Sequence, residues 1–262
     1  MRPLKIAVLI KQVPEAGAPL KINAGRSWVE ETNLSFTTNE SDSYALEEAL
    51  LLKEAGSAEV LACTLGPERA DQVLKDALAK GADRALLLTD ELFAQLDVQG
   101  AALALARALI EERCDLILLG LQADDTGEAQ LGPALAERLD LPHVTLVVET
   151  TLENGSVKVR QEQENGWFQH LNVTLPALFT IQSGINRPRY ASLRGIMAMK
   201  SKEIRQLSAS DLNLSAVDLT PQQTLYGLGV PPKTKQTTVI EGSPAEVVAR
   251  LVEALANEAQ VI

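Results

Sequence analysis

Several features are scarce in this chain of 262 residues, and each scarcity argues against a class of protein. Cysteine occurs only as Cys63 and Cys114, both inside apolar runs, so we expect buried thiols of a reducing compartment rather than disulfides. Histidine occurs only as His143 and His170, and neither has Cys, His or carboxylate neighbours at metal-ligand spacing. We therefore expect no metal site. No apolar run approaches the length of a membrane span.

Basic residues are outnumbered by acidic ones, which gives a formal net charge of −11. A phosphate backbone is bound by a basic surface, so nucleic acid is not expected as a partner. The segment Met1–Val13 has a basic start and a short apolar run but no small-residue cleavage site, so it does not resemble a signal peptide. We expect a cytoplasmic protein.

Catalytic motifs are missing as well. The sequence contains no G-x-S-x-G, no H-E-x-x-H, no G-x-x-x-x-G-K-[ST] and no G-x-G-x-x-G. We therefore expect no catalytic side chains in this chain.

Short apolar runs that alternate with helical patterns fill the first half of the chain. Strands are expected at Lys5–Ile10, Glu59–Leu65, Ala85–Thr89 and Asp115–Gly120. Helices are expected at Asp42–Ala55, from Gly66-Pro67 to Lys80, at Val98–Glu112 and at Gly132–Leu139. Strands without polar alternation, separated by helices, indicate a parallel sheet covered on both faces. The fold class is therefore α/β, with a doubly wound, mostly parallel sheet.

The pattern changes after about residue 145. Strands are expected at Val144–Glu153, Ser156–Gln163, Trp167–Leu175 and Leu178–Ile181. The first three are separated by Asn154-Gly155 and Asn165-Gly166, which are strong hairpin signals. We therefore expect an antiparallel hairpin portion beside the parallel sheet.

The last part of the chain is polar, and its residues 202–242 contain Pro221, Pro231 and Pro232. We place a domain boundary between residues 201 and 202, so that residues 1–201 form the α/β domain and residues 202–262 form a C-terminal arm with a terminal helix at Ser243–Glu258. Residues 202–242 have too little apolar periodicity to form a core of their own. Two interpretations stay open for them, an arm laid across another subunit and a disordered linker.

The loop Gly120–Pro133 is the best candidate for a ligand site. It joins the end of a strand to the start of a helix, where free main-chain N–H groups form a natural phosphate site. A capped loop without a ligand is the alternative. Two further loops, Thr38–Asp42 and Leu65–Pro67, are expected at the same edge of the sheet, where doubly wound proteins bind nucleotides. Together the three loops favour a nucleotide pocket.

One segment, Leu175–Lys200, is too apolar for a simple connection. It reads LPALFTIQSGINRPRYASLRGIMAMK, and its core GIN-x-PRY-x-SL followed by IM-x-x-K resembles the β subunit of electron transfer flavoprotein. The resemblance extends over nearly the whole chain. It includes K-Q-V-P at Lys11–Pro14, the Asn39–Ala49 segment, G-A-D-R at Gly81–Arg84, and Q-x-G-P at Gln130–Pro133.

The resemblance implies an adenine-nucleotide-binding type of α/β domain. It also implies a heterodimer with an α subunit that holds the redox-active FAD, and AMP bound to the β subunit. The implied AMP contacts are Gly66, Gly120, Gln122 and Asp125, with main-chain N–H groups of Glu128, Ala129, Gln130 and Leu131 at the phosphate. Residues from Asn39 to Asp42 are implied to lie near the adenosine. Leu193, with Ile196 and Met197, is implied to dock into a dehydrogenase, and the arm with its helix is implied to pack on the α subunit.

Three functions follow as hypotheses. In the first, the protein carries electrons from flavin dehydrogenases, such as acyl-CoA dehydrogenases, to a quinone-reducing or similar acceptor. In the second, a second FAD fills the β pocket and electrons from NADH are bifurcated; the pair Ala129-Gln130 is shared with that subset of the family, whereas its D-x-D-T pattern is missing. Glu40-Ser41 also replaces the family's usual Pro-Phe. The third is a stand-alone adenine-nucleotide-binding sensor.

Overall fold

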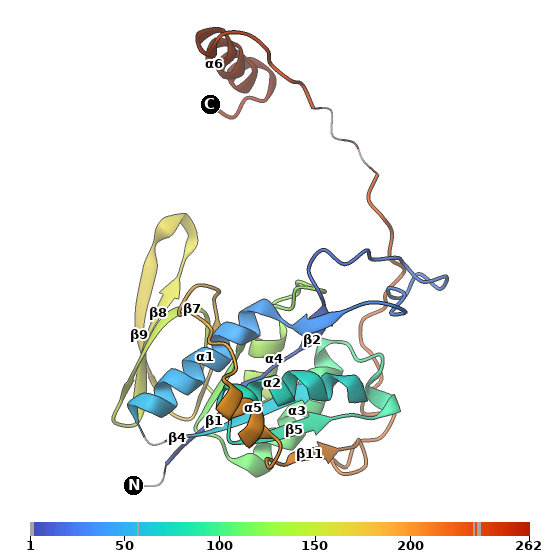
Figure 1. Ribbon diagram of the computed structural model, residues 1–262, viewed down its shortest axis with the longest axis vertical. Helices are drawn as coiled ribbons and strands as arrows, with labels where there is room; N and C mark the ends of the chain where they lie inside the picture. Colours follow the sequence, from blue (N-terminus) through green and yellow to red (C-terminus); the bar gives the residue numbers. More distant parts are fainter. Residues whose placement is uncertain (1–2, 57, 233, 235–236) are drawn as a thin grey trace.

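The computed structural model describes residues 3–56, 58–232, 234 and 237–262 (Figure 1). Within these ranges the large sheet contains nine strands in the order β11-β5-β4-β1-β6-β10-β7-β8-β9. They are β1 (Leu4–Leu9), β4 (Ala58–Leu65), β5 (Arg84–Leu88), β6 (Leu116–Gly120), β7 (His143–Glu153), β8 (Ser156–Glu162), β9 (Phe168–Thr174), β10 (Ala177–Ile181) and β11 (Ile204–Leu207). From β11 to β7 all neighbours are parallel, whereas β8 and β9 are antiparallel. The predicted fold class is confirmed.

Helices cover both faces of the parallel part. They are α1 (Glu40–Ala55), α2 (Asp71–Lys80), α3 (Val98–Glu112) and α4 (Leu131–Leu139); α5 (Leu193–Met199) packs against α2, and α6 (Pro244–Glu253) does not cover the sheet. Alternate residues of β1 point to opposite faces, as a strand requires. Ile6 and Val8 pack with the apolar residues of α1 and α2. Ala7 and Leu9 pack with those of α3 and α4. The main body is thus a three-layer sandwich.

The antiparallel portion lies where the two Asn-Gly pairs predicted it. The strand β7 first pairs with β10, and this register shifts between Val144 and Val147, around Leu146 with its positive φ of 55°; the register against β8 shifts between Val147 and Glu149. Beyond this bulge, β7, β8 and β9 form a three-stranded extension whose inner side chains, including Val157 and Val159, join the core on the α1 side. The β8–β9 hairpin projects beyond the body in Figure 1.

Four short elements were not expected from the sequence. Strands β2 (Gln12–Pro14) and β3 (Phe36–Thr38) form a small antiparallel pair. Helix α5 occupies part of the Leu175–Lys200 segment, and β11 lies in the expected polar tail. Because β11 pairs with β5 and Leu207 is buried, the chain stays with the body beyond residue 201. Four apolar residues that follow are also buried, namely Ala209, Leu212, Leu214 and Leu219.

The arm leaves the body after Leu219. The main-chain N–H groups of Gln222 and Gln223 donate to Asp97 Oδ2. Further along, Leu228 N–H donates to Arg26 O at 2.7 Å, and Arg26 Nε donates back to Leu228 O. The chain then reaches α6, which lies far from the body in Figure 1 and exposes Val248, Leu251 and Val252 among its apolar residues.

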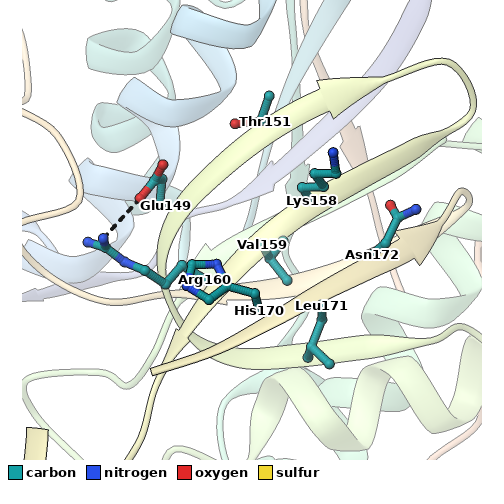
Figure 2. Close-up of a pocket in the computed structure, with 8 residues that line it drawn as sticks. All are labelled: Glu149, Thr151, Lys158, Val159, Arg160, His170, Leu171 and Asn172. Carbon is teal, nitrogen blue, oxygen red and sulfur yellow. Dashed lines mark ion pairs between the residues drawn. The ribbon is translucent and has the colours of Figure 1, made fainter. Parts of the chain in front are cut away.

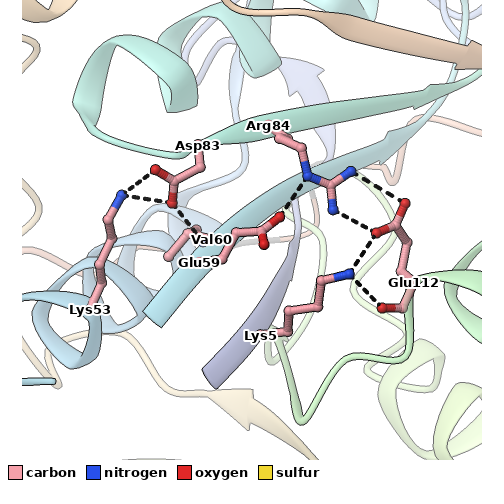
Figure 3. Close-up of polar contacts among 7 residues, drawn as sticks. All are labelled: Lys5, Lys53, Glu59, Val60, Asp83, Arg84 and Glu112. Carbon is pink, nitrogen blue, oxygen red and sulfur yellow. Dashed lines mark hydrogen bonds and ion pairs between the residues drawn. The ribbon is translucent and has the colours of Figure 1, made fainter. Parts of the chain in front are cut away.

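Charged side chains tie the layers together at the amino ends of the strands (Figure 3). Arg84 of β5 binds Glu59 of β4 at 2.6 Å and Glu112 of α3 at 2.6 Å. Lys5 of β1 donates to the main-chain oxygen of Glu112 at 2.9 Å. This network occupies the edge of the sheet opposite to the expected nucleotide edge, which leaves the carboxyl ends for a site.

Candidate functional site

The order of the strands reverses between β1 and β6. From β1 the chain proceeds through β4 to β5 on one side, and then returns to β6 on the other side. Ligands of doubly wound sheets bind at the carboxyl ends of the strands at this point, because the flanking connections diverge there. In this chain the surrounding residues are the end of β1, the start of α1 and the loop that follows β6.

Asp42 connects the two strand ends. Its Oδ2 accepts the N–H of Lys11 at 2.8 Å, and its Oδ1 accepts the N–H of Gly120 at 2.7 Å. The side chain of Gly120 has to be absent, because a Cβ there would lie 2.6 Å from Asp42 Oδ1 and would also collide with Ser41 Oγ. The start of α1 therefore sits directly on the end of β6.

Asn39 and Ser41 hold the loop after β6. Both side chains donate to the carbonyl oxygen of Gln122, at 2.9 Å and 2.8 Å, and Asn39 Oδ1 accepts the N–H of Asp124. Asp124 Oδ2 in turn accepts the N–H of Glu40 at 3.0 Å. We call Asn39, Ser41 and Asp42 the loop clamp. Asn39 is the N-cap residue by position, but its side chain bonds the loop rather than the helix.

The electrostatics of the clamp depend on burial. Asp42 is 6% exposed, and this burial raises its pKa from the ordinary 3.8 to about 7, although the hydrogen bonds from Lys11, Gly120 and Asn39 act in the opposite direction. The ammonium of Lys11 lies 2.6 Å from Asp125 Oδ1. This ion pair connects the loop to the segment that follows β1. It also offsets the negative charge of Asp125 next to the expected phosphate site.

The loop continues into the amino end of α4. Gly127 and Ala129 have positive φ angles of 64° and 54°. No side chain caps α4, and the main-chain N–H groups from Glu128 to Leu131 make no hydrogen bond within the described part of the chain. Free N–H groups at the positive end of a helix are suited to an anion.

The structure thus brings together most of the predicted cofactor residues. Asn39, Asp42, Gly120, Gln122 and Asp125 are joined by the contacts above, and Glu128, Ala129, Gln130 and Leu131 follow in the same loop. Gly66 lies at the carboxyl end of β4, the neighbour of β1, where its N–H donates to Leu88 O at 3.0 Å. Asn39 and Asp42 use their side-chain polar atoms on the protein itself, and their contact with adenosine stays a prediction.

Helix α5 presents apolar side chains to the solvent. Leu193 is 83% exposed, and Met197, Ile196 and the preceding Tyr190 are also exposed. We call these four residues the docking patch. Leu193 does not pack within its own chain. The helix can approach α2 closely because Gly195 has no side chain, and a Cβ there would collide with Ala79 O.

A family model described as "Electron transfer flavoprotein domain" matches residues 27–212. The chain is 34% identical to electron transfer flavoprotein subunit beta of Bacillus subtilis, over 99% of the chain and 100% of the relative. The chain belongs to the electron transfer flavoprotein β subunit family.

Two further relatives show how wide the family is. The subunit beta from Methylophilus methylotrophus is 34% identical over 95% of this chain and 97% of the relative. A subunit of the caffeyl-CoA reductase-Etf complex of Acetobacterium woodii is 32% identical over 96% of this chain and 98% of the relative.

Two residues of this flavoprotein subunit have roles that the sequence did not predict. Arg189 binds Glu47 of α1 through two nitrogens and reaches Glu54 with a third, and Asn186 donates to Glu48 Oε2 at 2.9 Å. Both lie in the GIN-x-PRY core that identified the family, so the signal was the motif itself. They fasten the segment before α5 onto α1.

A surface hollow of about 300 Å³ lies away from the nucleotide edge, on the outer face of the three-stranded extension (Figure 2). Glu149 and Arg160 form an ion pair of 3.2 Å there, beside Lys158 and His170. Opposite charges are already paired in it, and it contains no nucleophile next to a base. We therefore base the site on the strand ends and not on this hollow.

Among the residues that the structure describes, no group of three His, Cys, Asp or Glu side chains could hold a metal ion. None of their helices combines the length and the apolar character that crossing a bilayer requires. Cys63 and Cys114 are free, and burial raises the pKa of both thiols.

Proposed function

We propose that this chain is the β subunit of a heterodimeric electron carrier. Its α partner holds an FAD that accepts electrons from flavin dehydrogenases, such as acyl-CoA dehydrogenases, and delivers them to a quinone-reducing or similar acceptor. The match over nearly the full length to relatives named electron transfer flavoprotein subunit beta carries this proposal. A cytoplasmic location stays a prediction.

The loop after β6 fits the phosphate of AMP. The N–H groups from Glu128 to Leu131 have no partner among the described residues and lie at the positive end of α4. Of the acidic groups in the loop, Asp125 is paired with Lys11, and Asp124 accepts a main-chain N–H. In this proposal the free N–H groups bind the phosphate, and Gln122 has an exposed side chain available to the rest of the nucleotide. AMP bound only to the folded state would also stabilise the subunit.

The flavin supplies the redox chemistry when it is bound. This chain contributes the remaining functions. Its body provides a packing surface for the partner, its loop binds the nucleotide, and its docking patch contacts dehydrogenases. A small apolar patch around one large anchor suits a transient encounter, because a few buried side chains dominate the binding energy.

The nucleotide content tests the proposal. The complex with the partner subunit is purified and denatured, and the released nucleotides are separated and counted. We expect one FAD and one AMP per heterodimer. Two FAD per heterodimer would replace this function by the bifurcating one, and isolation as a stable, colourless single chain would favour the nucleotide sensor.

The docking patch has a separate test. In Leu193→Ala we expect electron transfer from a dehydrogenase to require roughly ten times more carrier for half-maximal rate, because an exposed anchor contributes about 1–2 kcal/mol on binding. The flavin spectrum should not change. The matched control is Ile110→Ala, an exposed residue of α3 on the other face of the sheet. Wild-type rates in Leu193→Ala would remove the anchor from the proposal.

A further inference from the structure

A residue can contribute to a nucleotide site by contacting the ligand or by holding the residues that contact it. The geometry of the loop clamp distinguishes these two roles. The register between β1 and β6 ends at Leu9 and Leu119. The N–H groups of Lys11 and Gly120 lie beyond this register, and Asp42 accepts both of them. The two oxygens of one carboxylate therefore fix the strand ends relative to each other.

The side chains of the clamp have few hydrogen-bonding positions left for a ligand. Asn39 is 1% exposed, and its amide donates to Gln122 O and Ser41 Oγ while its oxygen accepts from Asp124 N–H. Asp42 is similarly buried. The groups that are free belong to the loop, at the start of α4. The shape of the loop consequently depends on side chains that a nucleotide would not need to reach.

We propose that Asp42 is a positioning residue, whose ionised carboxylate holds the ends of β1 and β6 so that the loop from Gly120 to Leu131 presents its N–H groups to the phosphate. This inference rests on the proposed function of the same loop. It goes beyond that function because it makes nucleotide binding depend on the charge of the Asp42 side chain, which does not touch the nucleotide.

The surroundings of Asp42 make that charge adjustable near neutral pH. Burial raises its pKa to about 7. The charged groups near it are Lys11 from β1, Asp124 and Asp125 from the loop, and Glu40 on its own helix; Lys11 is paired with Asp125. Protonation of Asp42 would turn one carboxylate oxygen into a hydroxyl, which is a poorer acceptor for an N–H. The hydrogen bond that fixes one of the two strand ends would then weaken.

The experiment measures the affinity for AMP by calorimetry, on the dialysed complex with the partner subunit, from about pH 8 to about pH 6. We expect the wild-type affinity to fall roughly tenfold across this range, as expected for the loss of one charge-assisted hydrogen bond. Asp42→Asn places an NH₂ donor against a main-chain N–H. Its affinity should be low throughout and should retain only the pH dependence of the phosphate, whose second pKa is about 6.

The controls separate this inference from the proposed function. Glu40→Gln lies in the same turn, keeps its main-chain N–H and should reproduce the wild-type profile. Wild-type affinity and profile in Asp42→Asn would overturn the positioning role while the nucleotide site stands. A wild-type complex that binds AMP at no pH would overturn the proposed function and this inference with it.

A second measurement needs no variant. Hydrogen exchange at the ends of β1 and β6, corrected for the intrinsic pH dependence of exchange, reports directly on the two N–H groups that Asp42 accepts. We expect their protection against local openings in which Asp42 stays buried to fall roughly tenfold as the pH decreases through about 7. Constant corrected protection would contradict the role of Asp42 even if Asp42→Asn does not fold.

Discussion

At the scale of single residues, Asp42 combines a useful position with a cost in stability. An ionised carboxylate that is almost fully buried loses its hydration, and the two main-chain N–H groups replace only part of it. Such a group is retained where the fold needs its geometry. The pH dependence of folding should reveal this cost separately from any effect on the nucleotide.

We expect the stability of the wild-type protein, relative to Asp42→Asn, to increase as the pH falls from about 8 to about 5. The folded pKa of about 7 lies above the ordinary 3.8, so in this interval the folded state takes up a proton that the unfolded state does not. The gain should be on the order of 2–4 kcal/mol. Denaturant unfolding at several pH values measures it. A difference that is constant with pH would mean that Asp42 titrates normally.

Two buried threonines give a second prediction at this scale. The hydroxyl of Thr64 has no hydrogen-bond partner among the described residues, whereas Thr180 Oγ1 accepts the N–H of Leu146 at 3.2 Å. Thr64→Val should leave the free energy of unfolding unchanged or raise it by up to about 1 kcal/mol, since it removes an unsatisfied polar group. Thr180→Val, the control, should lower it by about 1–2 kcal/mol. Equal losses in both variants would contradict this contrast.

The site residues show how far sequence could lead. The position of Asn39 and Asp42 beside the loop was predictable, because the start of a helix and the ends of parallel strands meet at one edge. Their role was not predictable. The sequence around Asp42 is the same whether its carboxylate accepts N–H groups of a ligand or those of Lys11 and Gly120. Only the folded structure distinguishes these donors.

At the scale of elements, α5 is held from both sides. Arg189 and Asn186 fasten the preceding segment to α1, and Lys202 donates to Leu78 O and Ala82 O at the carboxyl end of α2. Ser192 caps the helix by accepting the N–H of Gly195. The docking patch is therefore presented by a fixed support before any partner arrives, and this preorganisation reduces the entropy that binding has to overcome.

We expect Arg189→Lys to weaken docking to dehydrogenases by roughly three- to tenfold without changing the flavin spectrum. Lysine keeps the charge but cannot make the paired contacts with Glu47 while also reaching Glu54. The concentration of carrier at half-maximal electron transfer measures the effect. Arg187→Lys is the matched control, because Arg187 is exposed. Equal behaviour of the two variants would show that the anchoring is irrelevant to docking.

The elements that the sequence missed share a physical cause. The strands of the parallel sheet were predictable because each is a continuous apolar run, and the extension was predictable from its Asn-Gly turns. In contrast, α5 has seven residues with Gly195 among them, and β11 has four residues with two large apolar side chains. Neither is favoured by its own propensity. Contacts with α2 and β5 stabilise them, and local patterns do not encode those contacts.

At the scale of the whole molecule, the body and α6 are separate. No hydrogen bond or ion pair connects α6 with the remainder of the described chain, and its capping box with Ser243 and Glu246 is local. A chain that ends at Val230 should therefore melt within about 2 °C of the full chain, because it keeps the whole core. It should also bind the partner subunit more weakly. Thermal unfolding and co-purification measure the two effects.

One result of this truncation would contradict the independence of the body from α6. A melting temperature lowered by more than about 5 °C would mean that the residues after Val230 stabilise the body itself. A control truncated after Glu258 keeps α6 and should match the full chain in both measurements. Unchanged co-purification of the shorter chain would remove the arm from the interface and leave the body alone as the binding surface.

The two hydrogen bonds between Arg26 and Leu228 hold the arm against the body and so affect assembly. Beyond them, the chain from Val230 to Ser243 spans at most about 45 Å at ~3.3 Å per residue. This length limits how far α6 can lie from the body. Within that radius the local concentration of α6 is high. A partner bound by both the body and α6 would rebind at one contact before the other opens, so the complex would dissociate more slowly than either contact alone.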